Sequence, residues 1–186
     1  MSQDVEQLKR ELPLHRRLQP GPAGVVVMAT CADREGRPNI ITLGMYMPIS
    51  TNPPMVCIGV APQRYSHRLI EETEEFVINT PSITLEEQMH YCGVKSGRDV
   101  DKFAETGLTP IPALKVKPPR IEECFGHIEC RVVQSHVCGD HTLFVGDVVA
   151  TSADEDVMRG DVLDVLKARP IVQKNHVYFT VTDKKG

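Results

Sequence analysis

Short apolar and β-branched runs recur along the first half of the chain and predict strands. Residues 25–30 read Val-Val-Val-Met-Ala-Thr, and a turn follows before a second run at 39–47. We expect these two runs to pair as a hairpin. Residues 50–54 contain two prolines, which cannot donate to a strand ladder, and predict a loop. Further strands are predicted at 55–60 and 76–79.

Helix signals stand between these strands. Residues 66–75 predict a helix with Ser66 as its N-cap. Thr84 and Glu87 have the spacing of a capping box, which predicts a second helix ending near residue 91. A third, short helix is expected at 100–105, where Gly107 would end it.

The second half of the chain has fewer helix signals. It predicts a long strand, its hairpin partner, a short helix and two closing strands, at 121–135, 142–151, 161–167, 171–173 and 177–181. Hairpin connections with helices inserted between them favour a mainly β fold, an antiparallel barrel. We expect one domain over 1–186, with residues 1–19 as an N-terminal helical extension.

Composition narrows the class of protein. The chain has 186 residues, a formal net charge of −4 and a pI near 6.0, which argues against binding nucleic acid through phosphate neutralisation. The first ten residues lack the apolar core of a signal peptide, and no apolar run is long enough to span a membrane. We therefore expect a cytoplasmic protein. Its six cysteines form no CxxC motif and are expected to be reduced thiols.

A candidate anion site lies at the start of the first predicted helix. A helix N-terminus presents unpaired N–H groups and about half a positive charge. Arg64, Ser66 and His67 would add a guanidinium, a hydroxyl and a titratable donor there. The alternative is a capped surface helix with a solvated arginine, and the local pattern leaves both open.

The predicted strand 39–47 could flank a flat apolar ring. Side chains alternate along a strand, so Asn39, Leu43 and Met45 share one face. Gly44 inside a strand is typical of a bulge or of close approach by a ligand. Methionine adapts well to an aromatic ring, although these methionines could equally fill a core.

Two other groups of residues could take part in chemistry. Residues 96–103 combine two cations, two anions and a glycine, and Lys102 could reach a phosphate there. A zinc site disagrees with strand geometry, because Cys124 and Cys130 point to one face and His127 to the other. We expect no metal, and we find no P-loop, nucleophile elbow, HExxH or GxGxxG motif.

Several short segments together match a known family in order, over about residues 20–182. They are residues 38–42, 50–54, 64–67, 76–79, 92–93, 96–103, 139–141 and 145–146. With them the chain resembles the flavin reductase-like proteins that have an FMN-binding split barrel, and most closely the flavoredoxin branch. One departure is Met45, where flavoredoxins can carry tryptophan, so stacking on the flavin would change.

The resemblance implies a Greek-key split β-barrel with inserted short helices, forming a homodimer with FMN near the subunit interface. It implies that Asn39 and Met45 line the flavin and that Ser66 and Lys102 hold its phosphate. His141 would approach from the second hairpin, and Tyr178, with Phe179 as a competitor, would pack against the cofactor. The full set of expected FMN-binding residues is Asn39, Thr42, Leu43, Gly44, Met45, Ser50, Arg64, Ser66, His67, Lys102, His141 and Tyr178.

The expected function is an FMN-binding oxidoreductase that passes electrons from NAD(P)H or a partner protein through the flavin. The redox chemistry belongs to the cofactor, and backbone N–H groups of residues 42–45 would stabilise negative charge on the reduced ring. The alternatives are a flavoredoxin-type electron carrier without NAD(P)H activity and a ferric-complex reductase. A thiol or zinc sensor built on Cys124, Cys130 and Cys138 is the alternative from another class.

Overall fold

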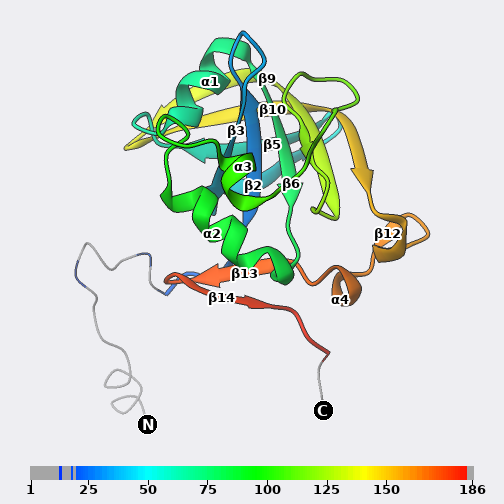
Figure 1. The fold of residues 1–186 in the computed structure, drawn as a ribbon. Helices are drawn as coiled ribbons and strands as arrows, with labels where there is room; N and C mark the ends of the chain where they lie inside the picture. The colour runs from blue at the N-terminus through cyan, green and yellow to red at the C-terminus, as the bar shows by residue number, and fades with distance from the viewer. Residues whose placement is uncertain (1–12, 14–17, 19, 184–186) are drawn as a thin grey trace.

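A seven-stranded antiparallel sheet forms the centre of the molecule (Figure 1). The computed structural model describes residues 13, 18 and 20–183. The strand order is β3-β2-β6-β9-β10-β5-β4. The strands span β2 Val27–Ala32, β3 Pro38–Leu43, β4 Tyr46–Thr51, β5 Pro54–Val60, β6 Glu75–Thr80, β9 Gly126–Cys138 and β10 His141–Ala153.

The two edges of this sheet are consecutive in the sequence. β3 and β4 lie at opposite ends of the strand order, yet only Gly44 and Met45 separate them. The sheet must therefore curl until its edges meet at this link, where Gly59 N donates to the Met45 carbonyl at 3.0 Å. The predicted mainly β split barrel with inserted short helices is confirmed.

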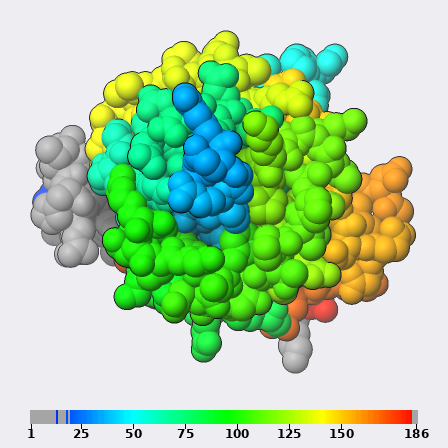
Figure 2. All heavy atoms as spheres, turned by 45° about the horizontal axis from the view of Figure 1, so that its top comes forward, coloured from blue at the N-terminus to red at the C-terminus, as the bar shows by residue number. Residues whose placement is uncertain are grey.

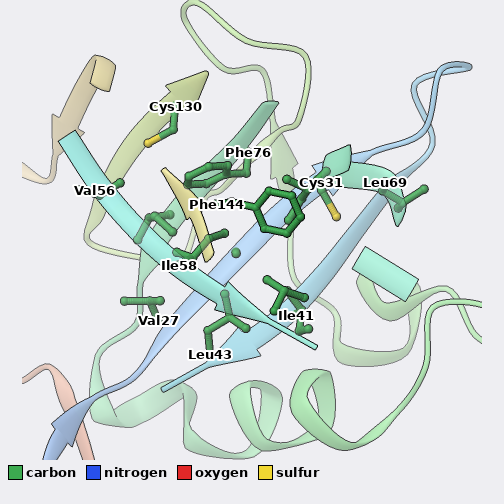
Figure 3. Close-up of a cluster of buried hydrophobic side chains, with 14 residues drawn as sticks. Val27, Cys31, Ile41, Leu43, Val56, Ile58, Leu69, Phe76, Cys130 and Phe144 are labelled. Atoms are coloured by element: carbon green, nitrogen blue, oxygen red, sulfur yellow. The ribbon is translucent and has the colours of Figure 1, made fainter. Parts of the chain in front are cut away.

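Apolar side chains fill the barrel interior (Figure 3). Phe76 from β6 and Phe144 from β10 meet the aliphatic side chains of Ile41 and Ile58, and all four are nearly or fully buried. Burial of each such side chain contributes about 1.5–3 kcal/mol to folding. Packing in this interior fixes the positions of β3 and β5, whose residues line the cavities described below.

A second apolar layer covers the outer face of β2 and β3. Helices α1 Tyr65–Thr73, α2 Glu86–Val94 and α3 Lys102–Thr106 follow one another in the sequence, and α2 and α3 lie in front of the sheet in Figure 1. Met89 and Phe103 from these helices pack against Met28 and Ile40 of the two strands.

The C-terminal part adds smaller elements. β13 Ile171–Lys174 pairs with β1 Gly24–Val25 and with β14 Val177–Thr180 in a three-stranded sheet. The rest are the 3-10 turns Ile83–Leu85 and Glu155–Val157, strands β7 Pro110–Ile111, β8 Arg120–Ile121, β11 Met158–Arg159 and β12 Val162–Leu163, and helix α4 Val165–Ala168.

Two predictions about strands were wrong. Residues 39–47 are two strands broken at Gly44 and Met45, and Tyr46 packs against the barrel interior beside Ile41 and Leu43 rather than on the opposite face. The chain crosses between the sheet edges at this point, so the alternation restarts. The loop expected at 50–54 is only a tight turn, because β4 continues to Thr51 and β5 begins at Pro54.

Helix starts were also displaced. Arg64, not Ser66, is the N-cap of α1, and it makes no side-chain capping bond. The capping box does not form, because a 3-10 turn takes up Thr84 and α2 begins at Glu86. α3 begins two residues later than expected, with Asp101 as N-cap, but it does end at Gly107 in the left-handed conformation.

In the second half of the chain, a strand and a helix begin later than the sequence predicted. The long strand expected from 121 begins at Gly126, after a turn through Cys124. The helix expected at 161–167 is the single turn Val165–Ala168, capped by Asp164. The N-terminal helical extension over 1–19 falls outside the described residues, except for 13 and 18.

Two features are absent from the described residues, a membrane-spanning helix and a cluster of metal-binding side chains. Among the helices there, none combines the length and apolarity needed to cross a membrane. Over the same part of the chain, no group of three or more His, Cys, Asp or Glu side chains could hold a metal ion.

Candidate flavin site

Two adjoining cavities lie beside β3 and the Gly44–Met45 link that follows it. The first, named here the Ser66 cavity, has a volume of about 150 Å³ and lies between the start of α1 and residues 92–98. The second, the Met45 cavity, has a volume of about 430 Å³ and lies between residues 41–45 and 59–61. The two share Ile41, Gln63, Arg64 and Gly93, so they form one continuous site.

The Ser66 cavity is strongly cationic. Its lining includes four cations, Arg64, Lys95, Arg98 and Lys102, and contains no aspartate or glutamate. In the described part of the chain, no carboxylate lies within 4 Å of any of the four. A pocket with this much unbalanced positive charge is suited to an anion.

The N-terminus of α1 contributes to the same cavity. The N–H groups of Tyr65 and Ser66 are in the first turn, where the helix offers them no carbonyl four residues back. The helix dipole adds positive potential at this end, and Arg64, as the N-cap residue, stands directly beside it. The predicted grouping of Arg64, Ser66 and Lys102 around one cavity is therefore present in the structure.

Asn39 and Gly97 fix the shape of this cavity. The Asn39 side chain donates from Nδ2 to Ser66 Oγ at 2.7 Å, which ties β3 to α1. A Cβ atom at position 97 would run into Asn39 Oδ1, so only glycine lets the 96–98 loop approach this closely. The cavity thus depends on a residue without a side chain opposite a buried amide.

Lys102 has a structural role that the sequence did not reveal. Its side chain is buried, and Nζ donates to the carbonyls of Ile40 at 2.6 Å and of Cys92 at 2.7 Å. Burial lowers the pKa of this lysine, and Arg64 lowers it further. An ammonium has three donors, so one remains for a ligand in the cavity.

The Met45 cavity has an apolar wall and a backbone wall. Met45, Leu43 and Ile41 come from β3 and its extension, and Gly59 faces them from β5. A Cβ at Gly59 would sit 2.9 Å from Met45 Sδ, so the glycine leaves room for that thioether. β3 pairs only with β2, and alternate backbone N–H groups on its other edge therefore lack a sheet partner.

His141 lies at the rim of the Met45 cavity. Its Nδ1 donates to Asp140 Oδ1 at 2.7 Å, which lowers the pKa of that carboxyl. The bond fixes the ring at the start of β10, beside the cavity.

The thiols near the site are unreactive by environment. Cys31 and Cys92 are buried, and burial raises the pKa of each to about 11. They remain protonated at neutral pH, and a protonated thiol is a poor nucleophile and metal ligand. All six cysteines of the chain are free, and five are buried.

Three of the expected cofactor residues lie outside both cavities. Ser50 is on β4, near its far end. His67 is buried between α1 and β10, where Nε2 contacts Thr142 Oγ1 at 2.8 Å and the ring packs edge-on against Phe144. Tyr178 packs against His90, with 3.4 Å between Tyr178 Oη and His90 Nδ1.

Other lining residues were missed. Gln63 borders both cavities, Lys95 adds a cation to the first, and Gln173 reaches the second from β13. No local sequence pattern could have predicted that Gln173 lines the cavity. It lies near the C-terminal end of the chain and is brought to the site by the pairing of β13 with β1. Lys95 precedes the 96–103 segment, and the mixed charges of that segment were the one sequence feature that could have pointed to Lys95.

An antiparallel split barrel with a cationic cavity that continues into a slot beside Met45 defines the class of flavin-binding split-barrel oxidoreductases. The family model described as "Flavin reductase like domain" matches residues 20–181. The chain therefore belongs to the flavin reductase-like family, close to flavoredoxin.

Individual relatives agree with this assignment. The structure of a flavoredoxin from Desulfovibrio vulgaris (Miyazaki F) superposes with a TM-score of 0.85 at 27% identity, covering 95% of this chain and 96% of that one. An NADH-dependent flavin reductase of a Rhodococcus species is 28% identical over 153 residues, 80% of this chain and 82% of the relative. A protein of Archaeoglobus fulgidus is 39% identical over 113 residues, but this covers only 61% of this chain and 64% of the relative.

Proposed function

We propose that this protein binds FMN in the joined Ser66 and Met45 cavities and passes electrons from NADH or NADPH through it. The observation that supports this most directly is the pairing of a carboxylate-free cavity containing four cations with an adjacent slot that Ile41, Leu43 and Met45 line on one side. FMN has the matching chemistry, an anionic phosphate at one end and a flat ring at the other. When bound, the flavin supplies the redox chemistry.

The residues present fit the phosphate end of such a ligand. Arg64 offers a guanidinium fork, the first turn of α1 offers the N–H groups of Tyr65 and Ser66, and Lys102 has one ammonium donor left. Lys102 also positions the cavity walls, because it binds Ile40 on β3 to Cys92 on α2. Its loss would damage the cavity as well as remove a charge.

The residues also fit the ring end. Met45 gives a polarisable surface for an aromatic ring. The free-edge N–H groups within residues 42–45 would donate to the electron-rich edge of a reduced ring and so stabilise its negative charge. Gly59 leaves room for the Met45 thioether at the edge of this cavity.

We also propose that the protein forms a homodimer through the outer face of β4, β5 and β10. Tyr46, Ile58 and Phe144 pair across these strands and point into the barrel, so their neighbours point outward. Two of those neighbours, Met45 and Met47, are 50% and 59% exposed. A second copy would cover them beside the Met45 cavity and complete its open side.

The proposal has two versions, which differ in whether the electron donor is a nicotinamide nucleotide or a partner protein. The relative from Rhodococcus is described as an NADH-dependent flavin reductase, which supports direct use of a nicotinamide nucleotide. The structural neighbour from Desulfovibrio is described as a flavoredoxin, which supports the alternative of an electron carrier fed by a partner protein. Anaerobic oxidation of NADH and NADPH by the FMN-loaded protein distinguishes them.

One titration tests the binding site itself. Purified protein is freed of flavin and titrated with FMN and with riboflavin, which lacks the phosphate. We expect FMN to bind at least about ten-fold more tightly, since charged hydrogen bonds contribute about 1.5–3 kcal/mol each. Protein that binds neither ligand, or both equally, contradicts the proposal. Size-exclusion chromatography with light scattering tests the dimer, and a monomer would refute that part.

A further inference from the structure

One side chain of the Met45 cavity comes from a part of the chain remote from the others. Gln173 lies on β13, which pairs with β1 and β14. In Figure 1 these C-terminal strands lie at the opposite end of the molecule from the β2–β3 turn. On the face shown in Figure 2 that turn (blue) is central, and red C-terminal atoms are seen only near the lower edge. Gln173 therefore reaches the cavity from the side opposite the β2–β3 turn.

The Gln173 amide lies directly against the link that joins β3 to β4. A Cβ atom at Gly44 would be only 3.1 Å from Gln173 Nε2, so the absence of a side chain at Gly44 makes room for the amide. Gly24, the β1 partner of Gln173, borders the same link, since a Cβ there would be 4.0 Å from the Gly44 carbonyl oxygen. The amide is thus placed beside the link, at the wall of the Met45 cavity.

The hydrogen-bonding capacity of this amide is almost unused within the described residues. Its Oε1 accepts from His176 N at a long 3.4 Å, and no bond from Nε2 to another described group is present. A glutamine amide has two donors and two acceptor lone pairs. Both donors and one lone pair of Gln173 therefore remain for a molecule in the cavity.

The other polar side chains of the Met45 cavity are engaged or lie elsewhere in it. Thr42 Oγ1 donates to a backbone carbonyl of α2 at 2.5 Å. Gln63 and Arg64 also line the Ser66 cavity, so they belong to the phosphate end of the site, and His141 lies at the rim. Gln173 lines the Met45 cavity and not the Ser66 cavity, which places its amide at the ring end.

We propose that Gln173 recognises the imide edge of the flavin ring, where an N–H group lies between two carbonyls. The inference rests on the proposed function, because it requires the ring to lie in the Met45 cavity. A primary amide presents a donor beside an acceptor, so Nε2 can donate to one ring carbonyl while Oε1 accepts from the ring N3–H. This pair of bonds selects a ring whose N3 is unsubstituted. Gln173 is thus a specificity-determining residue that the C-terminal sheet contributes to the site.

The test compares FMN with its N3-methyl derivative by isothermal titration of the full-length protein. The methyl group removes the N3–H donor and so prevents the bond to Oε1. We expect Gln173→Leu to raise the Kd for FMN about ten-fold, while the Kd for N3-methyl-FMN changes less than about two-fold. Riboflavin should lose affinity by the same factor as FMN, because the amide contacts the ring and not the phosphate.

Two further variants serve as controls. Gln88→Leu, on α2 and outside both cavities, should leave all three Kd values unchanged. Gln173→Met keeps the length of the side chain and removes both polar groups, so it gives the same readout if the leucine variant does not fold. Thermal unfolding shows whether each variant is folded.

Several outcomes would overturn the proposal while leaving the FMN site intact. They are equal weakening of FMN and N3-methyl-FMN by Gln173→Leu, an unchanged Kd for FMN in that variant, and wild-type protein that binds the two ligands equally. Weakening of FMN without a matching loss for riboflavin would also overturn it, because the amide would then contact the phosphate. Failure of the wild-type protein to bind FMN would instead refute the proposed function.

Discussion

Among the described residues, two clusters of buried polar side chains invite comparison, because only one of the two resembles a binding site. The first is the Ser66 cavity with Asn39, Ser66 and Lys102. The second, here the Glu129 cluster, is formed by Asn79, His127 and Glu129 on β6 and β9, and all three are at most 5% exposed. Residue types and burial alone do not separate the two.

The difference lies in how far the polar groups are satisfied within the protein. Glu129 accepts from the backbone N–H groups of Leu114 and Lys115 at 2.7 and 2.6 Å, and Asn79 accepts from Ile121 N at 2.8 Å. His127 Nε2 donates to the Ile121 carbonyl. These side chains bind the proline-rich segment 110–121 to the barrel, and the Asn79 amide nitrogen donates to the barrel carbonyls of Met28 and Val77.

The Ser66 cavity, by contrast, is lined by four cations, and in the described part of the chain no carboxylate lies within 4 Å of them. Unbalanced charge against a cavity, rather than buried polarity as such, therefore marks the functional region. Four experiments test this distinction.

Glu129→Ala should have the largest effect, and on stability alone. It removes two hydrogen bonds to a charged acceptor and leaves two N–H groups without partners, at a cost of about 3–4 kcal/mol in the free energy of unfolding. Urea denaturation measures this, and the exposed Glu122→Ala is the control. Loss of FMN affinity with unchanged stability would reverse the roles assigned to the two regions.

Arg64→Gln should affect binding rather than folding. Loss of one charged contact to phosphate is expected to raise the Kd for FMN about ten- to a hundred-fold, with the Kd for riboflavin nearly constant. The unfolding free energy should stay within about 0.5 kcal/mol of wild type, as for surface substitutions in general. Arg34→Gln is the matched control, and equal weakening of both ligands would place the phosphate elsewhere.

Gly59→Ala tests the ring end of the site. The added methyl group would crowd Met45 Sδ, which is the movable end of a flexible side chain. We expect FMN and riboflavin to lose affinity together, by about five-fold or 1 kcal/mol each. A selective loss for FMN would contradict the assignment of the Met45 cavity to the ring.

His127 should give the smallest effect, seen in the pH dependence of stability. Burial lowers the pKa of this histidine, which the fold holds neutral. Its contribution is present above the unfolded-state value near 6.5 and is lost as pH falls through the lower folded-state pKa. Between pH 7.5 and 5, His127→Gln should lose less unfolding free energy than wild type does. Identical pH profiles would show that His127 is not held neutral.

Part of the site could be predicted because short-range rules determine it. Strand alternation correctly placed Asn39, Ile41 and Leu43 on one face, and this face lines the cavities. The cationic start of the first helix was visible in the order Arg64, Tyr65, Ser66. Alternation failed after Gly44, where the chain passes from one sheet edge to the other.

Other features depended on segments that meet only in the folded chain. Lys102 was expected to hold a phosphate, and the structure adds two carbonyl partners for it, one on β3 and one near the end of α2. The position of His67 in the sequence suggested that it binds an anion. In the structure its Nε2 is instead hydrogen-bonded to Thr142, which is 75 residues away. Gln173 reaches the site through a sheet that joins the two ends of the described chain.

The sequence by itself determined the strands, the inserted helices and a cation-rich helix start, because hydrophobic period and local charge are properties of neighbouring residues. Only the tertiary structure decided which polar groups satisfy one another and which remain free for a ligand. Hydrogen bonds and ion pairs between distant segments depend on distances of a few ångströms, and those distances are set when the barrel closes at Gly44 and Met45.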